Sequence, residues 1–166
     1  MEVLALSDSG EYCRDESARR PLVSVVIPTY NSSGVVSRAL HSLERQTFTD
    51  FEVVIADSAR STDDLPRRIA AYNKFPLCVV TGVRGKGADG RNVGWQAARG
   101  RYVAFLDSDD EFLPSKLATC VASLEQGWAD VVYSQVFVER GVGRLWIKPW
   151  RGVVEGENIY DYMLVD

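Results

Sequence analysis

The sequence lacks the features that mark membrane-spanning, secreted or nucleic-acid-binding proteins. None of its apolar runs approaches the roughly 18 residues that a transmembrane helix needs. Residues 1–20 carry acidic groups where a signal peptide carries basic ones, and they have no long apolar middle. With 19 Lys and Arg against 23 Asp and Glu, the net charge is −4. No strongly basic face is expected, so nucleic acid is not a predicted partner.

Cysteine and histidine are also scarce. Cys13, Cys78 and Cys120 lie far apart, in a spacing that fits no zinc site and a number that suggests no disulfide framework. We interpret Cys78, in an apolar run, and Cys120, on a predicted helix, as packed thiols. This predicts a reducing, cytoplasmic location, with peripheral membrane association left open. The one histidine, His41, has no nucleophile or ligand partner nearby in sequence and is interpreted as a non-catalytic helix residue.

The composition is that of an ordinary globular protein. The chain has 166 residues, of which 46% are hydrophobic and 25% charged, enough for one domain with a substantial core. We predict a loosely ordered leader over residues 1–20 and a single domain over residues 21–166. There is no internal repeat and no low-complexity segment.

Apolar runs typical of buried strands alternate with amphipathic helical patterns. Pro28 is expected to end the first strand, and Ser32 or Ser33 to cap the first helix. This alternation predicts an α/β fold, with a mostly parallel sheet covered by helices on both faces. A hairpin and a last helix from residue 158 are expected to follow. The predicted strands are 22–27, 51–56, 77–81, 102–106, 131–138 and 145–150, and the predicted helices are 35–46, 65–72, 89–98 and 114–126.

The stretch that organises the chain is RYVAFLDSDDEF, residues 101–112, where a buried strand runs into Asp107, Asp109 and Asp110. Carboxylates so close together repel one another unless a cation lies between them. Mg²⁺ or Mn²⁺ would neutralise that charge, because these ions bind oxygen ligands and share their coordination shell with substrate phosphates. The alternative is that Asp107 and Asp109 only cap a turn before the next helix.

Three other loops are expected at the same edge of the sheet, where ligands bind in such folds. Tyr30, beside Thr29 and Asn31, could stack on a base and hydrogen-bond to it, or simply form a turn. Asp57, followed by Ser58, could accept hydrogen bonds from a base or ribose, while Ser61 or Asp63 could instead cap a helix.

The third loop is rich in glycine and in basic residues. Arg84, Lys86 and Arg91 could meet a diphosphate, or could form a solvated basic loop. The run GVRGKGADG does not have the spacing of a P-loop. Each of these loops is a weak signal alone, and their convergence on one edge is a stronger one.

Four segments carry a resemblance to a known family. In order, they are VSVVIPTYN, SLERQT, FEVVIADSARSTDD and GRNVGWQAARGRYVAFLDSDD. Over about residues 21–135 the chain resembles the nucleotide-sugar-binding part of a family 2 glycosyltransferase with the Rossmann-like GT-A fold. The combination is specific, although a DXD motif alone is not.

The resemblance implies roles for matching residues. Pro28, Thr29 and Tyr30 would flank a uracil or other base, with Asp57 and Ser58 in the loop that usually contacts it. Arg91 would lie near the sugar or diphosphate. Asp107 would meet the ribose, Ser108 would lie beside the donor, Asp109 would bind the metal, and Asp110 would support it; all three carboxylates are candidate metal ligands. The implied reaction is metal-dependent, inverting transfer from a nucleotide diphosphate sugar, with UDP as the expected nucleotide, to an acceptor hydroxyl, such as that of a saccharide.

The sequence departs from the family pattern in two ways. Ser58 stands where a second acid is usual, which affects base contact. Family members usually continue past the position of Asp166, so we expect the domain to be incomplete at its C-terminus, without its acceptor site. No catalytic base is assigned, because Glu155, Glu157 and Asp161 match no motif. The apolar side of residues 159–165 favours self-association of the chain.

Two other functions are alternatives for this sequence. The chain could bind a nucleotide sugar without transferring it. A sugar nucleotidyltransferase is disfavoured, because it would place a glycine-rich, arginine-bearing loop directly after the first strand, where this chain has PTYNSSG.

Overall fold

The computed structural model describes residues 11–14, 19–84, 87–127, 129–139 and 145–147. The chain forms two compact units, residues 1–122 and residues 123–166, which are treated separately. The division into a leader over residues 1–20 and one domain over residues 21–166 stays a prediction. The predicted helix from residue 158 and the apolar segment 159–165 lie outside the described residues.

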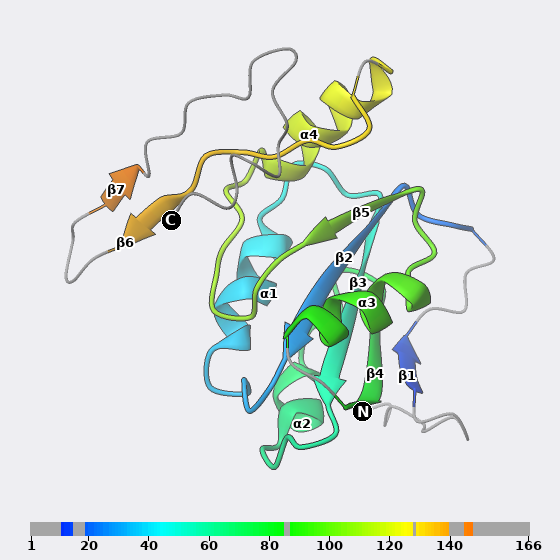
Figure 1. Cartoon of the computed structure of the whole chain (residues 1–166), viewed down its shortest axis with the longest axis vertical. Coiled ribbons are helices and arrows are strands. Elements are labelled where there is room, and N and C mark those ends of the chain that lie inside the picture. Colours follow the sequence, from blue (N-terminus) through cyan, green and yellow to red (C-terminus); the bar gives the residue numbers. More distant parts are fainter. Residues whose placement is uncertain (1–10, 15–18, 85–86, 128, 140–144, 148–166) are drawn as a thin grey trace. The chain divides into compact units, whose positions relative to one another are not determined.

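The first unit is built on a five-stranded sheet with the order β1-β4-β3-β2-β5 (Figure 1). Strands β4, β3, β2 and β5 run parallel, which confirms the predicted α/β class. Strand β1 is antiparallel to β4. The strands are β1 (Glu11–Arg14), β2 (Val23–Thr29), β3 (Phe51–Ser58), β4 (Leu77–Val83) and β5 (Tyr102–Phe105).

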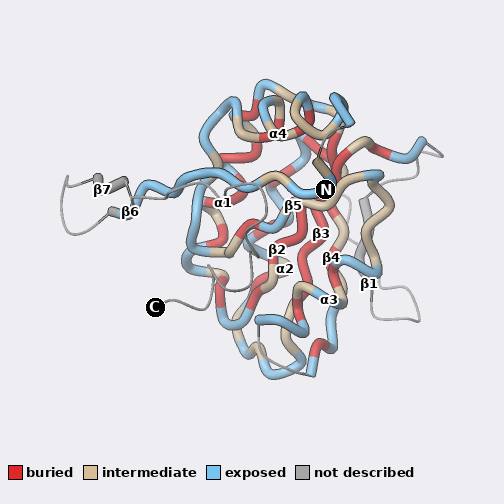
Figure 2. Tube along the Cα trace, turned by 45° about the horizontal axis from the view of Figure 1, so that its top comes forward, coloured by how far each residue is buried: buried red, intermediate tan, exposed pale blue. Residues whose placement is uncertain are grey.

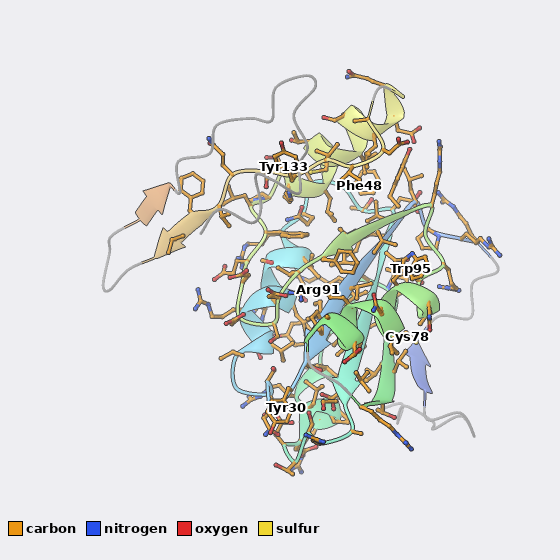
Figure 3. All side chains as sticks on the ribbon, viewed as in Figure 1. Tyr30, Phe48, Cys78, Arg91, Trp95 and Tyr133 are labelled. Carbon is orange, nitrogen blue, oxygen red and sulfur yellow. The ribbon has the colours of Figure 1, made fainter. Side chains whose placement is uncertain are left out.

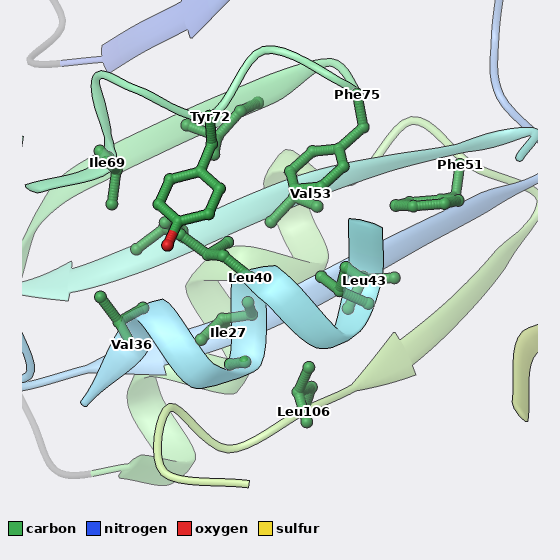
Figure 4. Close-up of a cluster of buried hydrophobic side chains, with 14 of the residues drawn as sticks. Ile27, Val36, Leu40, Leu43, Phe51, Val53, Ile69, Tyr72, Phe75 and Leu106 are labelled. Atoms are coloured by element: carbon green, nitrogen blue, oxygen red, sulfur yellow. The ribbon is translucent and has the colours of Figure 1, made fainter. Parts of the chain in front are cut away.

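Alternate side chains of the central strands face opposite sides of the sheet, as the pleat requires. On one side Val25, Ile27, Val53 and Ile55 join the main core cluster together with Leu40 of helix α1 (Val36–Glu44) (Figure 4). The same cluster includes residues of two more helices, α2 (Leu65–Ile69) and α4 (Lys116–Glu125). Figure 2 shows buried positions running along β2 and β3.

Helix α3 (Gly87–Ala97) covers the other side of the sheet at close range. A Cβ atom added to Gly94 would lie 2.4 Å from Cγ1 of Val26, and one added to Gly90 would lie 2.9 Å from Cβ of Pro28. Only glycine therefore lets the helix lie this close to β2. The prediction of helices on both faces is confirmed.

A buried polar network holds the end of α3 at the amino ends of the strands. Glu52 is 3% exposed and accepts a hydrogen bond of 2.6 Å from the Ser24 hydroxyl. Its other carboxylate oxygen accepts a hydrogen bond of 2.9 Å from Nε of Arg99. This pairing compensates the buried charge of Glu52. With one end fixed there, α3 extends along the sheet toward the carboxyl ends of the strands, where Gly90 contacts Pro28.

Several element boundaries differ from the predictions. Strand β2 continues through Pro28 to Thr29, so Pro28 does not end it. Helix α1 has Val35 at its N-cap and no side-chain cap, so neither Ser32 nor Ser33 caps it. Helix α3 begins at Gly87, inside the predicted glycine-rich loop. The weak helix propensity of glycine had indicated a loop there, but propensity is a weak guide that tertiary context overrides.

The strand β1 was not predicted, because residues 11–14 have no apolar pattern and depend on pairing with β4. In that pairing Cys13 lies opposite Cys78, and Cys78 is disulfide-bonded. The interpretation of Cys78 as a packed thiol is therefore wrong, whereas Cys120 is a free thiol. The error arose because the partner strand could not be recognised from sequence.

The second unit contains the antiparallel pair β6 (Phe137–Glu139) and β7 (Leu145–Ile147). This confirms the predicted hairpin pairing, but β6 is much shorter than the predicted strand over 131–138. Within the described ranges, no helix combines the length and apolar character that crossing a bilayer requires.

Candidate functional site

The candidate site lies where the four parallel strands end. Thr29 pairs with Asp57 in the register of β2 and β3, so the loops that follow these strands start side by side. Strand β5 pairs with β2 on its other side, which brings the acidic segment, Asp107–Asp110, to the same edge. The convergence of polar loops expected from the sequence is thus present in the fold.

Asp57 is the centre of the contacts between the first two loops. Its Oδ1 atom accepts a hydrogen bond of 2.8 Å from the Thr29 hydroxyl and another of 2.8 Å from the Ser61 hydroxyl. Thr29 is 6% exposed, whereas Asp57 is only half-buried. Two hydroxyl donors thus fix the direction of a carboxylate that still reaches solvent.

The remainder of the two loops is joined by further hydrogen bonds. The Asn31 side chain accepts one of 2.8 Å from the Thr62 amide, and Asp63 accepts one of 2.6 Å from the Ser33 amide. Asn31 has a φ of 48°, in the left-handed region that asparagine tolerates better than most residues. The sharp turn leaves the Tyr30 ring 61% exposed (Figure 3), free to stack on a planar ligand.

Ser58, the residue that replaces the expected second acid, faces the neighbouring strand. Its hydroxyl lies 3.5 Å from the Val83 carbonyl and accepts a hydrogen bond of 3.3 Å from the Arg60 amide. These are local contacts within the ends of β3 and β4. Arg84 is exposed, and Lys86 lies outside the described residues.

Arg91 connects helix α3 with the acidic segment. Its guanidinium group forms a close ion pair with the Asp107 carboxylate, and Figure 3 shows Arg91 reaching from α3 toward the loop after β5. Both side chains are partly exposed, at 38% and 45%. The two residues are 16 positions apart in sequence and were assigned separate roles, yet they neutralise each other here.

The other carboxylates of the acidic segment point less toward protein partners. The Asp110 amide donates a hydrogen bond of 3.0 Å to the Asp107 carbonyl, which closes a turn that exposes Asp109 and Asp110. Although Asp110 is largely exposed, partial burial raises the pKa of its carboxyl group. The charges of Asp109 and Asp107 raise this pKa further, and Arg38 opposes them. The segment is therefore a concentration of negative charge.

The acidic segment fits a divalent cation only as part of a shared shell. Within the described residues, no group of three or more His, Cys, Asp or Glu side chains is arranged to hold a metal ion by itself. The available donors are exposed carboxylate oxygens, which suit Mg²⁺ and Mn²⁺, and these ions commonly take their remaining ligands from substrate phosphates and water. The donor set is thus compatible with a metal that binds together with a diphosphate.

Some residues of the site were missed by sequence reasoning. Ser32 is 6% exposed, and its hydroxyl accepts a hydrogen bond of 3.0 Å from the Ser108 hydroxyl, which links the first loop with the acidic segment. Ser32 and Ser61 were considered only as helix caps. No local signal distinguishes a capping serine from Ser32, whose partner Ser108 lies 76 positions away, whereas Ser61 bonds to Asp57 only four positions away.

Comparison with known proteins identifies the family. The model of the family "Glycosyl transferase family 2" matches residues 24–164. The chain belongs to glycosyl transferase family 2. Its fold, with the parallel sheet and the acidic segment after β5, is the one that the resemblance implied.

A curated relative and two solved structures are similar to the chain. It is 32% identical over 149 residues to the amylovoran biosynthesis glycosyltransferase AmsB of Erwinia amylovora, with 84% of this chain and 50% of AmsB covered. The structure of S. aureus TarS 1–349 in complex with UDP-GlcNAc matches with a TM-score of 0.57 and 36% identity, covering 63% of this chain and 31% of that one.

The second structure is the mannosyltransferase PcManGT of Pyrobaculum calidifontis in complex with GDP-Man and Mn²⁺. It matches with a TM-score of 0.53 and 29% identity, over 63% of this chain and 32% of that one. The family 2 chain described here thus spans half the length of AmsB and about a third of these crystallised chains.

Proposed function

We propose that this family 2 chain binds a nucleotide diphosphate sugar, with UDP as its nucleotide, at the carboxyl ends of β2, β3 and β5. The observation that carries the proposal is the convergence of Tyr30, Asp57, Arg91 and the acidic segment on one edge of the sheet. The UDP-GlcNAc complex of the similar TarS structure supports the choice of nucleotide.

The residues divide between the two ends of the donor. Tyr30 stacks on the base, Pro28 and Thr29 form the floor beside it, and the oriented carboxylate of Asp57 accepts a hydrogen bond from the base. Ser58, a hydroxyl in place of an acid, leaves base choice mainly to Asp57. Arg91 moves from Asp107 to the negatively charged diphosphate. The Asp107 carboxylate is then able to accept hydrogen bonds from the ribose hydroxyls. The hydrogen bond from Ser108 to Ser32 holds the segment after β5 against the loop after β2.

Asp109 is the proposed principal ligand of Mn²⁺ or Mg²⁺, with Asp110 and Asp107 as further oxygen donors. A bound divalent ion would neutralise charge that develops on the leaving diphosphate. The Mn²⁺ in the similar PcManGT structure supports the choice of metal. Partial burial raises the pKa of the Asp110 carboxyl group, and the charges of Asp109 and Asp107 raise it further, so a cation beside the three carboxylates would be favoured.

The proposed reaction is transfer with inversion. An acceptor hydroxyl, with a saccharide as the favoured acceptor, attacks the anomeric carbon of the sugar. The bond from that carbon to the diphosphate oxygen breaks, UDP leaves with the bonding electrons, and the hydroxyl proton passes to a carboxylate base. None of the described residues is assigned as that base. The proposal includes a cytoplasmic location at or near a membrane, and the disulfide of Cys78 removes the cysteines as an argument for it.

Calorimetry with UDP, GDP and ADP, each in Mn²⁺ and in chelator, tests the donor site. We expect UDP to bind most tightly and Mn²⁺ to strengthen its binding. Equal affinities for the three nucleotides, with or without metal, would contradict the proposal. Release of free sugar or transfer from UDP-sugars, measured in parallel, distinguishes an active transferase from the alternative, a domain that binds the donor without transferring it.

A further inference from the structure

Helix α1 and the residues at its C-terminal end form hydrogen bonds with the chain that follows the acidic segment. Four side chains along one stripe of the helix and its C-terminal end take part: Arg38, Ser42, Arg45 and Gln46. Ser42 lies four residues after Arg38 within α1, and Arg45 and Gln46 follow three and four residues after Ser42 at the C-terminal end, so each lies close to Ser42 on that side of the helix. All four contact residues within 111–117, on the far side of the sheet from α3.

The charged part of this contact is centred on Glu111. One carboxylate oxygen accepts a hydrogen bond of 3.0 Å from Nε of Arg38, and the other accepts one of 3.0 Å from the Arg45 guanidinium. Because each oxygen has its own arginine, the carboxylate is held in one orientation. Glu111 is partly exposed, at 38%, so the two ion pairs contribute little to global stability.

The neutral part of the contact is buried. The Ser42 hydroxyl, which is 0% exposed, accepts a hydrogen bond of 3.0 Å from the Phe112 amide. The Gln46 side chain donates to the Leu113 carbonyl at 2.8 Å and accepts from the Leu117 amide at 3.1 Å. These bonds fix the backbone after Glu111 independently of the arginines.

The acidic segment is therefore anchored on both sides of its exposed carboxylates. Before them, the Ser108 hydroxyl is bonded to Ser32. After them, Glu111 is held by α1. Asp109 and Asp110 lie between the two anchors, and both are exposed.

We infer that Glu111, with Arg38 and Arg45, forms a clamp of positioning residues that presents Asp109 and Asp110 to a metal-bound diphosphate. The inference rests on the proposed function, because it concerns how the donor site is held. Residues that support metal ligands typically change metal affinity by roughly 10–100-fold when they are replaced. For a partly exposed clamp we expect the lower end of that range.

The decisive variant is Glu111→Gln, which removes the charge and keeps the shape. Its matched control is Glu44→Gln, which removes another α1 carboxylate that pairs with Lys74 at 3.5 Å, away from the acidic segment. Calorimetry with UDP in Mn²⁺ and in chelator is the measurement. We expect Glu111→Gln to lose about tenfold in affinity in Mn²⁺, to lose nothing in chelator, and to keep the melting temperature of Glu44→Gln.

Equal loss with and without metal would overturn the inference, because the role would then be generally structural. Unchanged affinity in Glu111→Gln would also overturn it. A wild-type chain whose UDP binding ignores metal would instead contradict the proposed function.

A second measurement tests the clamp in either case. Hydrogen exchange of the Asp110 amide in the ligand-free protein should accelerate in Glu111→Gln and not in Glu44→Gln. Unchanged exchange would overturn the clamp whatever the donor assay shows.

Discussion

Thr29, the last residue of β2, donates a hydrogen bond of 2.8 Å to the carboxylate of Asp57, which lies directly opposite it in β3. The pair joins two loops that are 28 residues apart in sequence, and it orients the carboxylate that we propose reads the base. The Thr29 side chain is buried, so water cannot easily replace its hydroxyl as the donor to Asp57.

Thr29→Val keeps the shape of the buried side chain and removes this donor. A hydrogen bond to a charged group contributes about 1.5–3 kcal/mol. Since Ser61 still holds Asp57, we expect UDP affinity to fall only about three- to tenfold. Asp57→Ala should lose at least as much, and the double variant no more than Asp57→Ala alone. Thr49→Val, at an exposed position, is the control. Additive losses in calorimetry would show that Thr29 acts independently of Asp57.

Arg91→Gln tests the proposed exchange of partners at the acidic segment. In the structure Arg91 pairs with Asp107, and the proposal moves it to the diphosphate. We expect UDP affinity to fall about tenfold, in line with the loss of a charge-assisted contact. Uridine affinity should be unchanged or higher, because uridine has no diphosphate and Asp107 is already free. Arg67→Gln, at an exposed ion pair with Asp64, is the control. Equal weakening of UDP and uridine would rule out a diphosphate contact.

Asp109→Asn and Asp107→Asn should differ in their dependence on metal. Asp109 is exposed and is the proposed metal ligand, so its variant should lose more than tenfold in UDP affinity in Mn²⁺ and little in chelator. Asp107→Asn should weaken binding in both conditions, since its proposed partner is the ribose. Calorimetry in the two buffers measures both. Identical metal dependence in wild type and Asp109→Asn would remove Asp109 from the ligand set.

Gly94→Ala tests whether close packing of α3 positions Arg91. The new methyl group would lie 2.4 Å from Val26 Cγ1, so the helix or the strand must move. Overpacking of this kind typically costs about 1–3 kcal/mol of unfolding free energy. Gly34→Ala, which has no atom within 4 Å of its new methyl group, is the control. Denaturant unfolding measures both variants.

A second-site change makes this test specific. Val26→Ala opens the space that the Gly94 methyl group needs, so Gly94→Ala should cost less in the Val26→Ala background than in the wild type. UDP affinity should follow the same order, because displacement of α3 carries Arg91 with it. The same cost in both backgrounds would show that Val26 is not the limiting contact.

The sequence by itself determined the alternation of strands and helices and the edge where the polar loops meet. Runs such as LVSVVI and FEVVIA are apolar enough to predict buried strands wherever they pack, and turn residues mark where each ends. The α/β class and the predicted hairpin pairing followed from such local signals, because these signals are encoded within short windows of residues. The family assignment rests instead on four longer segments that resemble the family.

Tertiary structure alone decided which residues that are distant in the sequence contact one another. Strand β1 is a polar segment that becomes a strand by pairing with β4, and Cys78 acquires a disulfide that its own neighbours in sequence do not indicate. The pairing of Arg91 with Asp107 and the grip of Arg38 and Arg45 on Glu111 join side chains that are 16, 73 and 66 positions apart. Such contacts depend on the distance between each helix and the sheet. On the α3 side, Gly90 and Gly94 set that distance, because they have no Cβ atom to keep the helix away from β2. A periodic pattern specifies which face of a helix is buried, but the partners across the interface are selected only when the whole core is packed.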